Sequence, residues 1–447
     1  MQATGGARHM KNIIGIRYED KYVMERRVPL IPYHIEKLIR GKGLQVHIEA
    51  SAKRVFSDDE YENAGAVVTY DLKDCPVIFG IKEIPVSKLE PDKTYVFFAH
   101  VIKGQPHNMA MLRRLMELKC NLIDYERVVD ELGKRLIFFG RFAGLAGMIN
   151  SLWSLGERLK EFDIETPFLD ISQARTYYSL DEARHVMSKV GQKIIETGLP
   201  SRLKPLVIGI AGYGNVSQGA QEIISLLPAK EVLPGELPHL FKHTQLPDNI
   251  IYKVVFKEEH IVEPIRSSDQ FDLLDYYRHP EKYGSQFEKY IPYLSVLING
   301  IYWDERYPRL VTKDFTEQLF MKGPPKLTVI GDISCDPNGS IELTHKGTEI
   351  ETPVFVYNPF TRQPTFGFKG EGLLIMAVDI LPSELPRDAS VAFSEFLWNY
   401  VEPIATADYS KPFESLKLPG SIKKALILHK GRLTPDYEYI AKFLETH

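Results

Sequence analysis

Ionisable residues follow two neighbouring apolar segments in the first third of the chain. Lys82 and Glu83 come shortly after the segment CPVIF, and His100 follows TYVFFA. If these segments are successive strands of an open parallel sheet, their carboxyl ends border the crevice where ligands bind. A lysine and a histidine placed there form an acid–base pair, and Lys103 adds a further cation. A surface lysine and a capping histidine are the alternative for either residue taken alone.

Several more cations stand near the expected strand ends. They are Arg17, Lys21, Arg26, Arg27, Lys103 and Arg135. Because the formal net charge is −4, such a group predicts a substrate with several carboxylates, which arginine matches with two parallel hydrogen bonds. Ordinary solvated charge is the alternative for each one singly, and it is our interpretation of Arg26. Glu83 and Glu126 are placed to hold neighbouring cations and to shift their pKa values.

The surrounding chain alternates short apolar runs with helical stretches. From Asn12 to about Arg135 the runs NIIGIRY, LQVHIEA, VVTY, CPVIFGIK, TYVFFAH and CNLIDYE are typical of strands, and helices are expected at about 29–40 and 108–119. This alternation predicts a mostly parallel sheet with helices on both faces. A helical region at about 142–196 follows, and then strands near 205–214, 250–256, 294–303, 327–334, 353–359 and 373–381. A loop is expected over 228–249, and helices over the tail from Ser383.

Length and composition indicate a globular protein of two domains. The chain has 447 residues, of which 44% are hydrophobic and 26% charged, which suits two domains of about 200 residues each. The small net charge gives no general attraction for nucleic acid, and no apolar run reaches the roughly 18 residues that span a membrane. Residues 1–11 are predicted to be a tag or a disordered terminus.

The cysteines indicate a reducing compartment. Cys75, Cys120 and Cys335 are widely spaced and odd in number, which fits neither a disulfide framework nor a zinc ligand set. We therefore expect no metal site, and a location in the cytoplasm or the mitochondrial matrix.

A glycine-rich turn follows the strand near residue 206, in LVIGIAGYGNVSQGAQEII. Gly212 and Gly214 suit a tight turn close to a pyrophosphate, Gly219 would let the next helix lie against the strand, and the helix N-terminus would face the phosphates. The spacing departs from G-x-G-x-x-G by two residues, so a turn without a ligand is the alternative. Lys257, at the expected tip of the second strand, favours a 2′-phosphate and hence NADP, although Glu258 and Glu259 follow at once.

Eight motifs occur in an order that identifies a family resemblance. They are R…ERRVPLIP, GIKEIP, FFAHVIKGQ, LIDYERVVDELGKR, FGRFAGLAGM, NGIYW, GDISCDPNGSIE and VDILPSELPRDAS. Together they resemble the lysine-forming saccharopine dehydrogenases, and in particular the lysine–ketoglutarate reductase half of aminoadipic semialdehyde synthases, within the wider alanine dehydrogenase–transhydrogenase group. The resemblance implies an α/β fold of two Rossmann-like domains with mostly parallel sheets and the active site in the interdomain cleft.

The resemblance also implies boundaries and site residues. Residues 12–140 plus 381–447 would form a substrate domain, and 141–380 an NAD(P)-binding domain. Lys82 and His100 match the catalytic pair of the family. The substrate-binding residues would be Lys21, Arg27, Glu83, Lys103, Glu126, Arg135 and Asp379. The cofactor-binding residues would be Gly212, Gly214, Asn215, Val216, Ser217, Gly219, Lys257, Asn299, Gly300 and Asp332.

The activity implied is condensation of L-lysine with 2-oxoglutarate and reduction by NADPH to saccharopine, a step of lysine degradation, with NADH the weaker candidate. An alanine-dehydrogenase-like enzyme acting on one small 2-oxo acid is an alternative, and a catalytically silent Rossmann-type binding protein is another. Homo-oligomerisation stays open. The chain would be either monofunctional or one half of a bifunctional enzyme, with a saccharopine-oxidising domain after its C-terminus.

Overall fold

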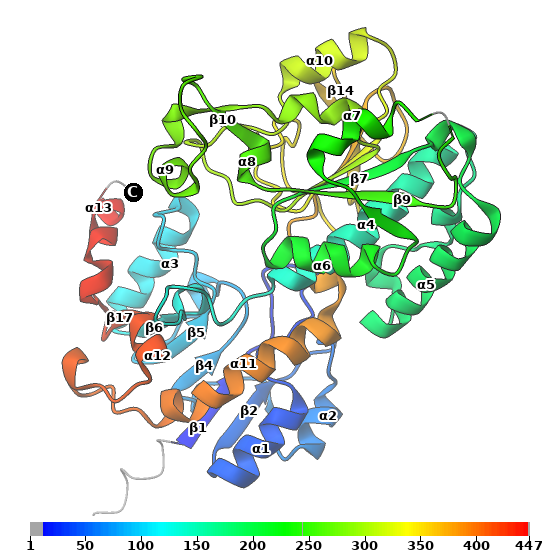
Figure 1. Cartoon of the computed structure of the whole chain (residues 1–447). Coiled ribbons are helices and arrows are strands. Elements are labelled where there is room, and N and C mark those ends of the chain that lie inside the picture. The colour runs from blue at the N-terminus through cyan, green and yellow to red at the C-terminus, as the bar shows by residue number, and fades with distance from the viewer. Residues whose placement is uncertain (1–11, 244, 446–447) are drawn as a thin grey trace, which may run out of the picture. The chain divides into compact units, whose positions relative to one another are not determined.

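The computed structural model describes residues 12–243 and 245–445, and the predicted tag lies outside them (Figure 1). The chain divides into two compact units. Unit 1 comprises Met1–Phe139 and Pro386–His447, and unit 2 comprises Gly140–Leu385. Each unit contains one eight-stranded sheet, so the predicted α/β fold with two mostly parallel sheets is confirmed.

The sheet of unit 1 has the order β18-β17-β6-β5-β4-β1-β2-β3. Its strands are β1 Ile13–Ile16, β2 Gln45–Glu49, β3 Val67–Thr69, β4 Val77–Phe79, β5 Thr94–Phe97, β6 Asn121–Asp124, β17 Leu426–His429 and β18 Arg432–Leu433. Strands β1 to β6 pair in parallel, whereas β17 is antiparallel to β6 and to β18. The helices expected in the tail are present, and its segment ALILHKGRL also supplies two strands at the edge of the sheet, which the sequence analysis did not predict.

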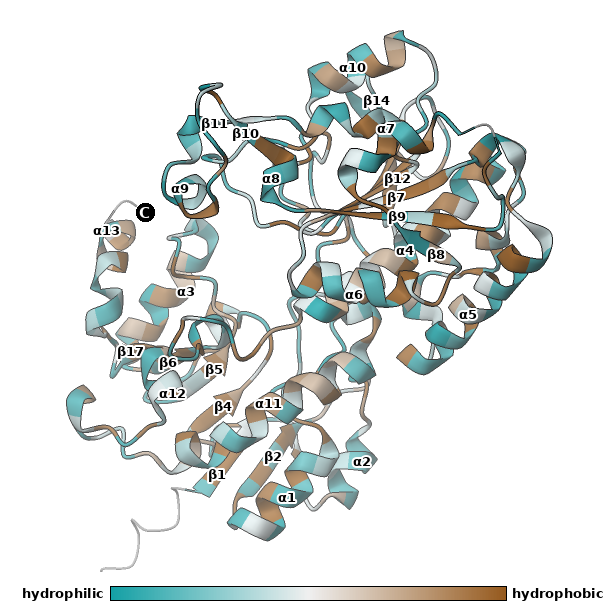
Figure 2. Cartoon of the chain, in the orientation of Figure 1, coloured by the Kyte–Doolittle hydropathy of each residue, from teal (hydrophilic) through white to brown (hydrophobic). Residues whose placement is uncertain are grey.

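Helices cover both faces of this sheet. They are α1 Pro32–Lys42, α2 Asp58–Asn63, α3 Pro106–Glu117, α11 Pro386–Thr406, α12 Gly420–Lys424 and α13 Ala441–Glu445. Because side chains alternate along a strand, Val96 of β5 joins the core packed against α1 and α11, while Tyr95 and Phe97 join a second core against α3. Figure 2 shows strands of both sheets in brown and the covering helices with mixed faces.

The sheet of unit 2 has the order β15-β14-β16-β13-β12-β7-β9-β8. Its strands are β7 Leu206–Ala211, β8 Ala229–Glu231, β9 Ile251–Phe256, β12 Val296–Asn299, β13 Val329–Asp332, β14 Val354–Asn358, β15 Gln363–Phe366 and β16 Leu373–Met376, and β10 Val262–Pro264 pairs with β11 Tyr283–Ser285. Strands β14 and β15 are antiparallel at one edge. The other edge strand, β8, lies in the stretch predicted to be a loop, because its three residues AKE carry no apolar pattern.

The helices of unit 2 are α4 Gly140–Lys160, α5 Leu180–Thr197, α6 Asn215–Ile224, α7 Leu237–Leu240, α8 Glu258–Ile261, α9 Leu273–Arg278 and α10 Lys313–Met321. The expected helical region at 142–196 is therefore two helices. Helix α4 packs on β13, where Ser151 lies so close to Gly331 that a Cβ atom there would overlap its hydroxyl. None of the helices among the described residues is long and apolar enough to cross a membrane.

Candidate functional site

The carboxyl ends of β4 and β5 are adjacent in unit 1 and carry the residues first singled out in the sequence. Lys82 and Glu83 follow β4, and His100 follows β5, which pairs with β4 in parallel. His100 has a φ of 49°, in the left-handed region. Its ring stacks on Phe98, with centroids 6.1 Å apart and planes 13° apart. The turn and the ring contact together fix the direction of the imidazole.

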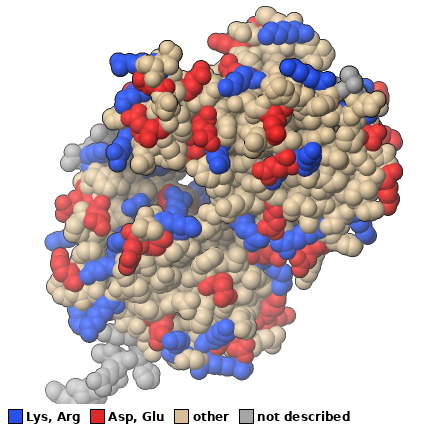
Figure 3. Space-filling view, viewed as in Figure 1, with Lys and Arg blue, Asp and Glu red and all other residues tan. Residues whose placement is uncertain are grey.

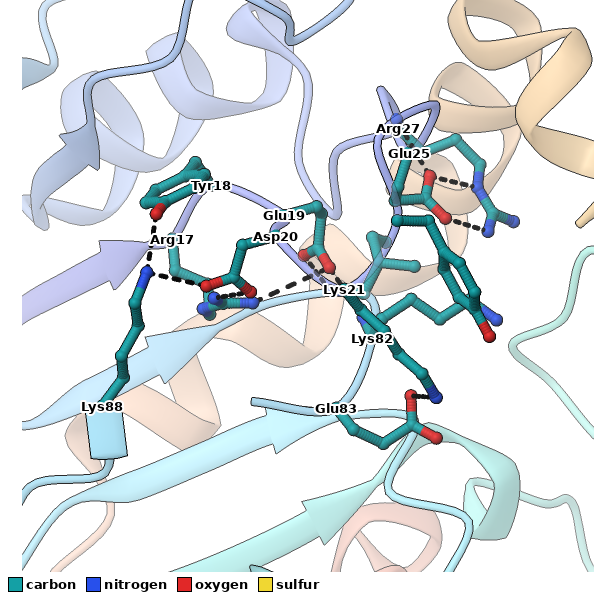
Figure 4. A network of polar contacts seen from close by, with 12 residues as sticks. Arg17, Tyr18, Glu19, Asp20, Lys21, Glu25, Arg27, Lys82, Glu83 and Lys88 are labelled. Atoms are coloured by element: carbon teal, nitrogen blue, oxygen red, sulfur yellow. Dashed lines mark hydrogen bonds and ion pairs between the residues drawn. The ribbon is translucent and has the colours of Figure 1, made fainter. Parts of the chain in front are cut away.

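Glu83 connects a lysine and the histidine. Lys21 Nζ lies 2.8 Å from Glu83 Oε2 (Figure 4). His100 Nδ1 lies 2.8 Å from Glu83 Oε1. Burial opposes the charge of the carboxylate, but the hydrogen bonds and charges of His100 and Lys21 outweigh it, and the pKa of Glu83 falls to about 2. An ionised carboxylate only accepts hydrogen bonds, so Nδ1 carries a proton and Nε2 is the nitrogen that can exchange a proton with a ligand.

Lys82 is held through its peptide by a carboxylate that the sequence analysis did not select. Glu19 accepts hydrogen bonds from the backbone N–H groups of Ile81, at 2.6 Å, and of Lys82, at 2.9 Å. Arg17 Nη1 lies 3.8 Å from the same carboxylate. Burial raises the pKa of Glu19 to about 7 despite the charge of Arg17. Glu19 therefore fixes the backbone from which Lys82 projects.

The two lysines of the site flank one aromatic ring. Lys82 Nζ lies 5.6 Å, and Lys21 Nζ 5.3 Å, from the ring centroid of Tyr22. Both lysines and Glu83 project toward the same side of the strand ends (Figure 4). The arrangement places the Lys21 ammonium and the His100 imidazole on the carboxylate of Glu83, with the Lys82 ammonium beside the ring of Tyr22. These cationic groups suit an anionic substrate.

Arg27 is buried rather than presented on the surface. Its Nε and Nη2 donate to the two carboxylate oxygens of Glu25 at 2.8 and 2.6 Å, and its guanidinium carbon lies 4.1 Å from the ring centroid of Phe139. Burial opposes the charge of Glu25, but Arg27 and Lys82 outweigh it, so the pKa of Glu25 is lowered. A substrate contact by Arg27 stays a prediction, and Glu25 is a further residue that the sequence analysis missed.

The remaining predicted substrate residues lie in different surroundings. Glu126 and Arg135 form an ion pair in unit 1. Lys103 is exposed in the turn before α3. Asp379 is exposed in unit 2, where its Oδ1 lies 3.8 Å from the thiol of Cys335. The roles of these residues in substrate binding stay predictions.

Asp124 is a buried carboxyl at the end of β6. Its Oδ1 accepts a hydrogen bond of 2.8 Å from the backbone N–H of Glu126, and its Oδ2 has no hydrogen-bond partner among the described residues. Burial raises its pKa to about 7. The signal in the sequence was an acid ending an apolar strand, but the sequence analysis selected only its neighbour Glu126.

A cavity of about 320 Å³ lies at the glycine-rich turn of unit 2, at the carboxyl ends of β7 and β12. Gly212, Gly214 and Gly300 line it, and Gly212 has a φ of 96°, which a residue with a Cβ atom rarely adopts. Asn215 is the first residue of α6, so the free N–H groups of that helix begin beside Gly214. A cavity here, with no side chain at three positions, fits a dinucleotide phosphate.

The acid at the tip of β9, and not the lysine, lines this cavity. Glu258 belongs to its wall and accepts a hydrogen bond of 2.6 Å from the hydroxyl of Tyr277, which also lines it. Lys257 is exposed, and its backbone N–H donates to Nδ1 of His260 at 3.0 Å. An acid and a lysine therefore both stand at the tip of β9, where the 2′-phosphate of NADP was predicted to bind.

Asn299 and Asp332 face each other inside unit 2. Asn299 Nδ2 donates to Asp332 Oδ1 at 2.8 Å and to Ser340 at 2.7 Å, and Thr344 donates to the other oxygen of Asp332 at 2.6 Å. Burial raises the pKa of Asp332 to about 6. These side chains tie the loop after β13 to the ends of β12 and β13, and any cofactor contact by them stays a prediction.

Position 219 requires a glycine for a different reason from the one expected. A Cβ atom there would overlap the carbonyl oxygen of Arg141 in α4, and one at Gly144 of α4 would overlap the carbonyl oxygen of Val216. The prediction that Gly219 lets its helix lie against the strand is therefore wrong: it lets α6 lie against α4. Ser217 is also buried, and it accepts a hydrogen bond from Gln221.

No group of three or more His, Cys, Asp or Glu side chains within 12–243 and 245–445 is arranged to hold a metal ion. The same ranges contain Cys75, Cys120 and Cys335 as free thiols.

The chain belongs to the alanine dehydrogenase/PNT family. The model of the family's N-terminal domain matches residues 15–146, and that of its C-terminal domain matches residues 279–436. Within this family it is 39% identical over 450 residues to the alpha-aminoadipic semialdehyde synthase of Arabidopsis thaliana, and 36% identical over 452 residues to the mitochondrial one of Bos taurus. The predicted resemblance is confirmed.

Coverage differs between the two kinds of relative. The matches include 97% and 98% of this chain but 42% and 48% of those synthases, so the chain spans about half their length. The saccharopine dehydrogenase [NAD(+), L-lysine-forming] of Emericella nidulans is 28% identical, with 86% of this chain and 90% of that protein covered.

Two solved structures share the fold. An L-alanine dehydrogenase superposes with a TM-score of 0.61 at 19% identity and covers 97% of this chain and 99% of its own. A transhydrogenase from Sinorhizobium meliloti superposes with a TM-score of 0.52 at 15% identity, with 94% and 100% covered. At these identities the likeness concerns the fold alone.

Proposed function

We propose that this chain is an oxidoreductase that condenses L-lysine with 2-oxoglutarate and reduces the product to saccharopine with NADPH. The observation that carries the proposal is the pairing of Lys21, Glu83 and His100 beside Lys82 at adjacent strand ends. The names of the relatives, aminoadipic semialdehyde synthase and saccharopine dehydrogenase, support the same substrate class.

The residues have distinct tasks in this reaction. The ε-amine of free lysine is protonated at neutral pH, so Lys82 accepts its proton and leaves an amine nitrogen that attacks the keto carbon. His100 Nε2 protonates the hydroxyl of the resulting carbinolamine, which leaves as water and gives a C=N bond. A bound dinucleotide supplies the hydride that reduces this bond.

The surrounding cations hold the substrates. Lysine and 2-oxoglutarate bring three carboxylates, and Lys21, Lys103 and Arg135 are the cations proposed to bind them. Arg27 is proposed to orient the substrates from the interior. Two of its donors are bound to Glu25. Holding both substrates in place supplies much of the acceleration, because the condensation then becomes effectively unimolecular.

The turn at Gly212, Gly214 and Gly300 is the proposed phosphate site, because its cavity adjoins the first turn of α6. We propose a preference for NADPH, supported by the exposed Lys257 at the tip of β9. The charge of Glu258 acts in the opposite direction.

Lys257→Ala should weaken NADPH binding roughly tenfold and leave NADH binding nearly unchanged. Its matched variant, Glu258→Gln, should strengthen NADPH binding. A wild-type protein that prefers NADH would contradict the preference.

The proposed activity is tested by following the oxidation of NADPH and NADH with both substrates present and then with each omitted. Oxidation that requires both lysine and 2-oxoglutarate, with saccharopine identified by mass spectrometry, is the expected result. Oxidation with a single 2-oxo acid and ammonia would indicate an alanine-dehydrogenase-like enzyme instead, and no oxidation would indicate a binding protein.

The names of the mammalian relatives include the word mitochondrial, which supports the matrix as the proposed compartment over the cytoplasm.

A further inference from the structure

Unit 2 contains a second, larger cavity at the amino ends of its parallel strands, opposite the carboxyl ends that carry the glycine-rich turn. Its volume is about 760 Å³, and its lining includes Leu206 at the start of β7, Ser295 before β12, and Leu327 before β13. Strand β7 has six residues, so about 20 Å separates its amino end, at this cavity, from its carboxyl end, at the glycine-rich turn. None of the residues assigned above to substrate or dinucleotide lines this cavity.

The walls of the cavity are largely apolar. Helix α4 contributes Leu155 and Leu159, which are almost fully buried, and Phe320 and Pro324 close the wall near the end of α10. A cavity of this size lies within the roughly 300–1,000 Å³ of small-molecule sites. It has room for a hydrocarbon chain or an aromatic ring.

Three cations line the same cavity: Arg158, Arg202 and Lys326. Lys326 Nζ donates to the carbonyl oxygen of Leu203 at 3.2 Å, and it forms no ion pair with a carboxylate among the described residues. Burial lowers its pKa to about 8. Arg202 also lines the cavity, and its Nη2 donates to the carbonyl oxygen of Phe162 at 3.0 Å.

Arg158, the third lining cation, is bound to backbone carbonyl groups of the cavity wall. It is buried, and its Nη2 donates to the carbonyl oxygens of Gly370 and Gly372 at 2.7 and 3.0 Å, so it ties the loop before β16 to α4. The acid in the lining is Glu371, which is exposed to solvent. The net charge of the lining is therefore positive, with Lys326 and Arg202 left to meet an anion.

An ammonium group without an anion beside an apolar wall is unfavourable, and a bound carboxylate would relieve it. We propose that this cavity is a binding site for a small amphipathic carboxylate, whose anionic group is held by Lys326 and Arg202 and whose apolar part lies against α4. The site is separate from the proposed reaction and does not depend on it.

The test uses the full chain and sodium 4-phenylbutyrate, with decanoate as a second probe, in titration calorimetry. Saturable binding with one site per chain is expected. Lys326→Met should weaken it roughly ten- to a hundredfold, as expected when a charged hydrogen bond is lost. Arg202→Met should act in the same direction. The neutral amide, 4-phenylbutyramide, should bind wild type and Lys326→Met equally weakly, since it cannot use the charge.

Lys82→Met is the matched control, because it removes a lysine proposed to act in the reaction and should leave probe binding unchanged. Cooperative thermal unfolding shows whether each variant is folded. If Lys326→Met is not folded, the affinity of Arg202→Met for the probes is measured in its place. Four results would overturn the proposal: no saturable binding of either probe, equal affinity of Lys326→Met and wild type, equal affinity for acid and amide, or a loss of binding in Lys82→Met.

Discussion

Glu83 decides, at the scale of the residue, what its neighbours can do. One oxygen of Glu83 forms an ion pair with Lys21 and the other accepts a hydrogen bond from His100. With a pKa of about 2 the carboxylate is charged across the physiological range. The hydrogen bond to this ionised carboxylate places a proton on His100 Nδ1, and Lys82 is the separate base of the proposed reaction. The proposed role of His100 Nε2 in proton transfer depends on this one carboxylate.

Lys82→Met should lower kcat about 10²- to 10⁴-fold, the usual cost of losing a general acid–base group, with a much smaller effect on dinucleotide affinity. Steady-state rates and dinucleotide titrations measure the two quantities. Lys88→Met is the control, since Lys88 pairs with Asp20 and Tyr18 in the same network. A Lys82→Met protein within threefold of the wild-type kcat would remove Lys82 from the proposed mechanism.

Asp124→Asn should stabilise the protein at alkaline pH relative to wild type. The folded-state pKa of Asp124 is raised to about 7 by burial, above about 3.9 in the unfolded chain. Its contribution to stability is thus complete below about pH 4 and is lost as pH rises through 7. Asparagine keeps the acceptor for the N–H of Glu126 and does not ionise. The difference in free energy of unfolding should grow by about 2–3 kcal/mol between pH 5 and 8.

Urea denaturation at each pH measures this difference, and the exposed Asp74→Asn controls for removing one carboxylate. A difference between Asp124→Asn and wild type that does not change with pH would show that Asp124 is already compensated in the folded state.

At the scale of the element, two glycines bring a long helix against the helix of the glycine turn. Gly144 in α4 and Gly219 in α6 each face backbone of the other helix. The same α4 reaches the second cavity through Leu155 and Arg158. One helix therefore extends from the carboxyl ends to the amino ends of the parallel strands in unit 2.

Gly144→Ala should destabilise the protein by about 1–3 kcal/mol or more, because the added methyl group overlaps the carbonyl oxygen of Val216 and the helices must separate. Gly235→Ala is the matched control, since nothing lies within 4 Å of a Cβ atom there. Denaturant unfolding compares the two. If both variants had wild-type stability, the contact between α4 and α6 would be looser than described.

At the scale of the whole molecule, the chain forms unit 2 without interruption and completes unit 1 only after returning at Pro386. Phe393 and Leu397 of α11 lie in the core of unit 1 beside Ile14 and Val96. On the face shown in Figure 3, Lys and Arg alternate with Asp and Glu, and neither sign forms a continuous field. This face therefore presents no broad surface for a polyanion.

A fragment of residues 140–385 should therefore fold alone and bind NADPH, whereas 12–139 without the tail should not fold. The first retains its complete sheet, and the second lacks α11, β17 and β18. Circular dichroism and cooperative thermal unfolding test both fragments. A cooperatively folded fragment 12–139 would show that the tail is dispensable for the core of unit 1.

Local patterns in the sequence determined the class of fold and most of its strands. Alternation of apolar runs with helical stretches is a property of neighbouring residues, so β1 to β6 and β7, β9, β12 and β13 were predicted close to their observed positions. The short polar strand β8 and the tail strands β17 and β18 were missed, because their pairing depends on partners distant in the chain. The residues Lys82, Glu83 and His100 were found in the same local way, at strand ends.

Only the tertiary structure decided which of these residues meet. That Glu83 joins Lys21 to His100, that Glu19 holds the peptide of Lys82, and that Glu258 lines the glycine-turn cavity depend on strand order and side-chain direction. The buried state of Asp124 and the lowered pKa of Lys326 likewise arise from packing. Hydrogen bonding and desolvation act between groups close in space, and a linear sequence carries no distances between residues far apart along the chain.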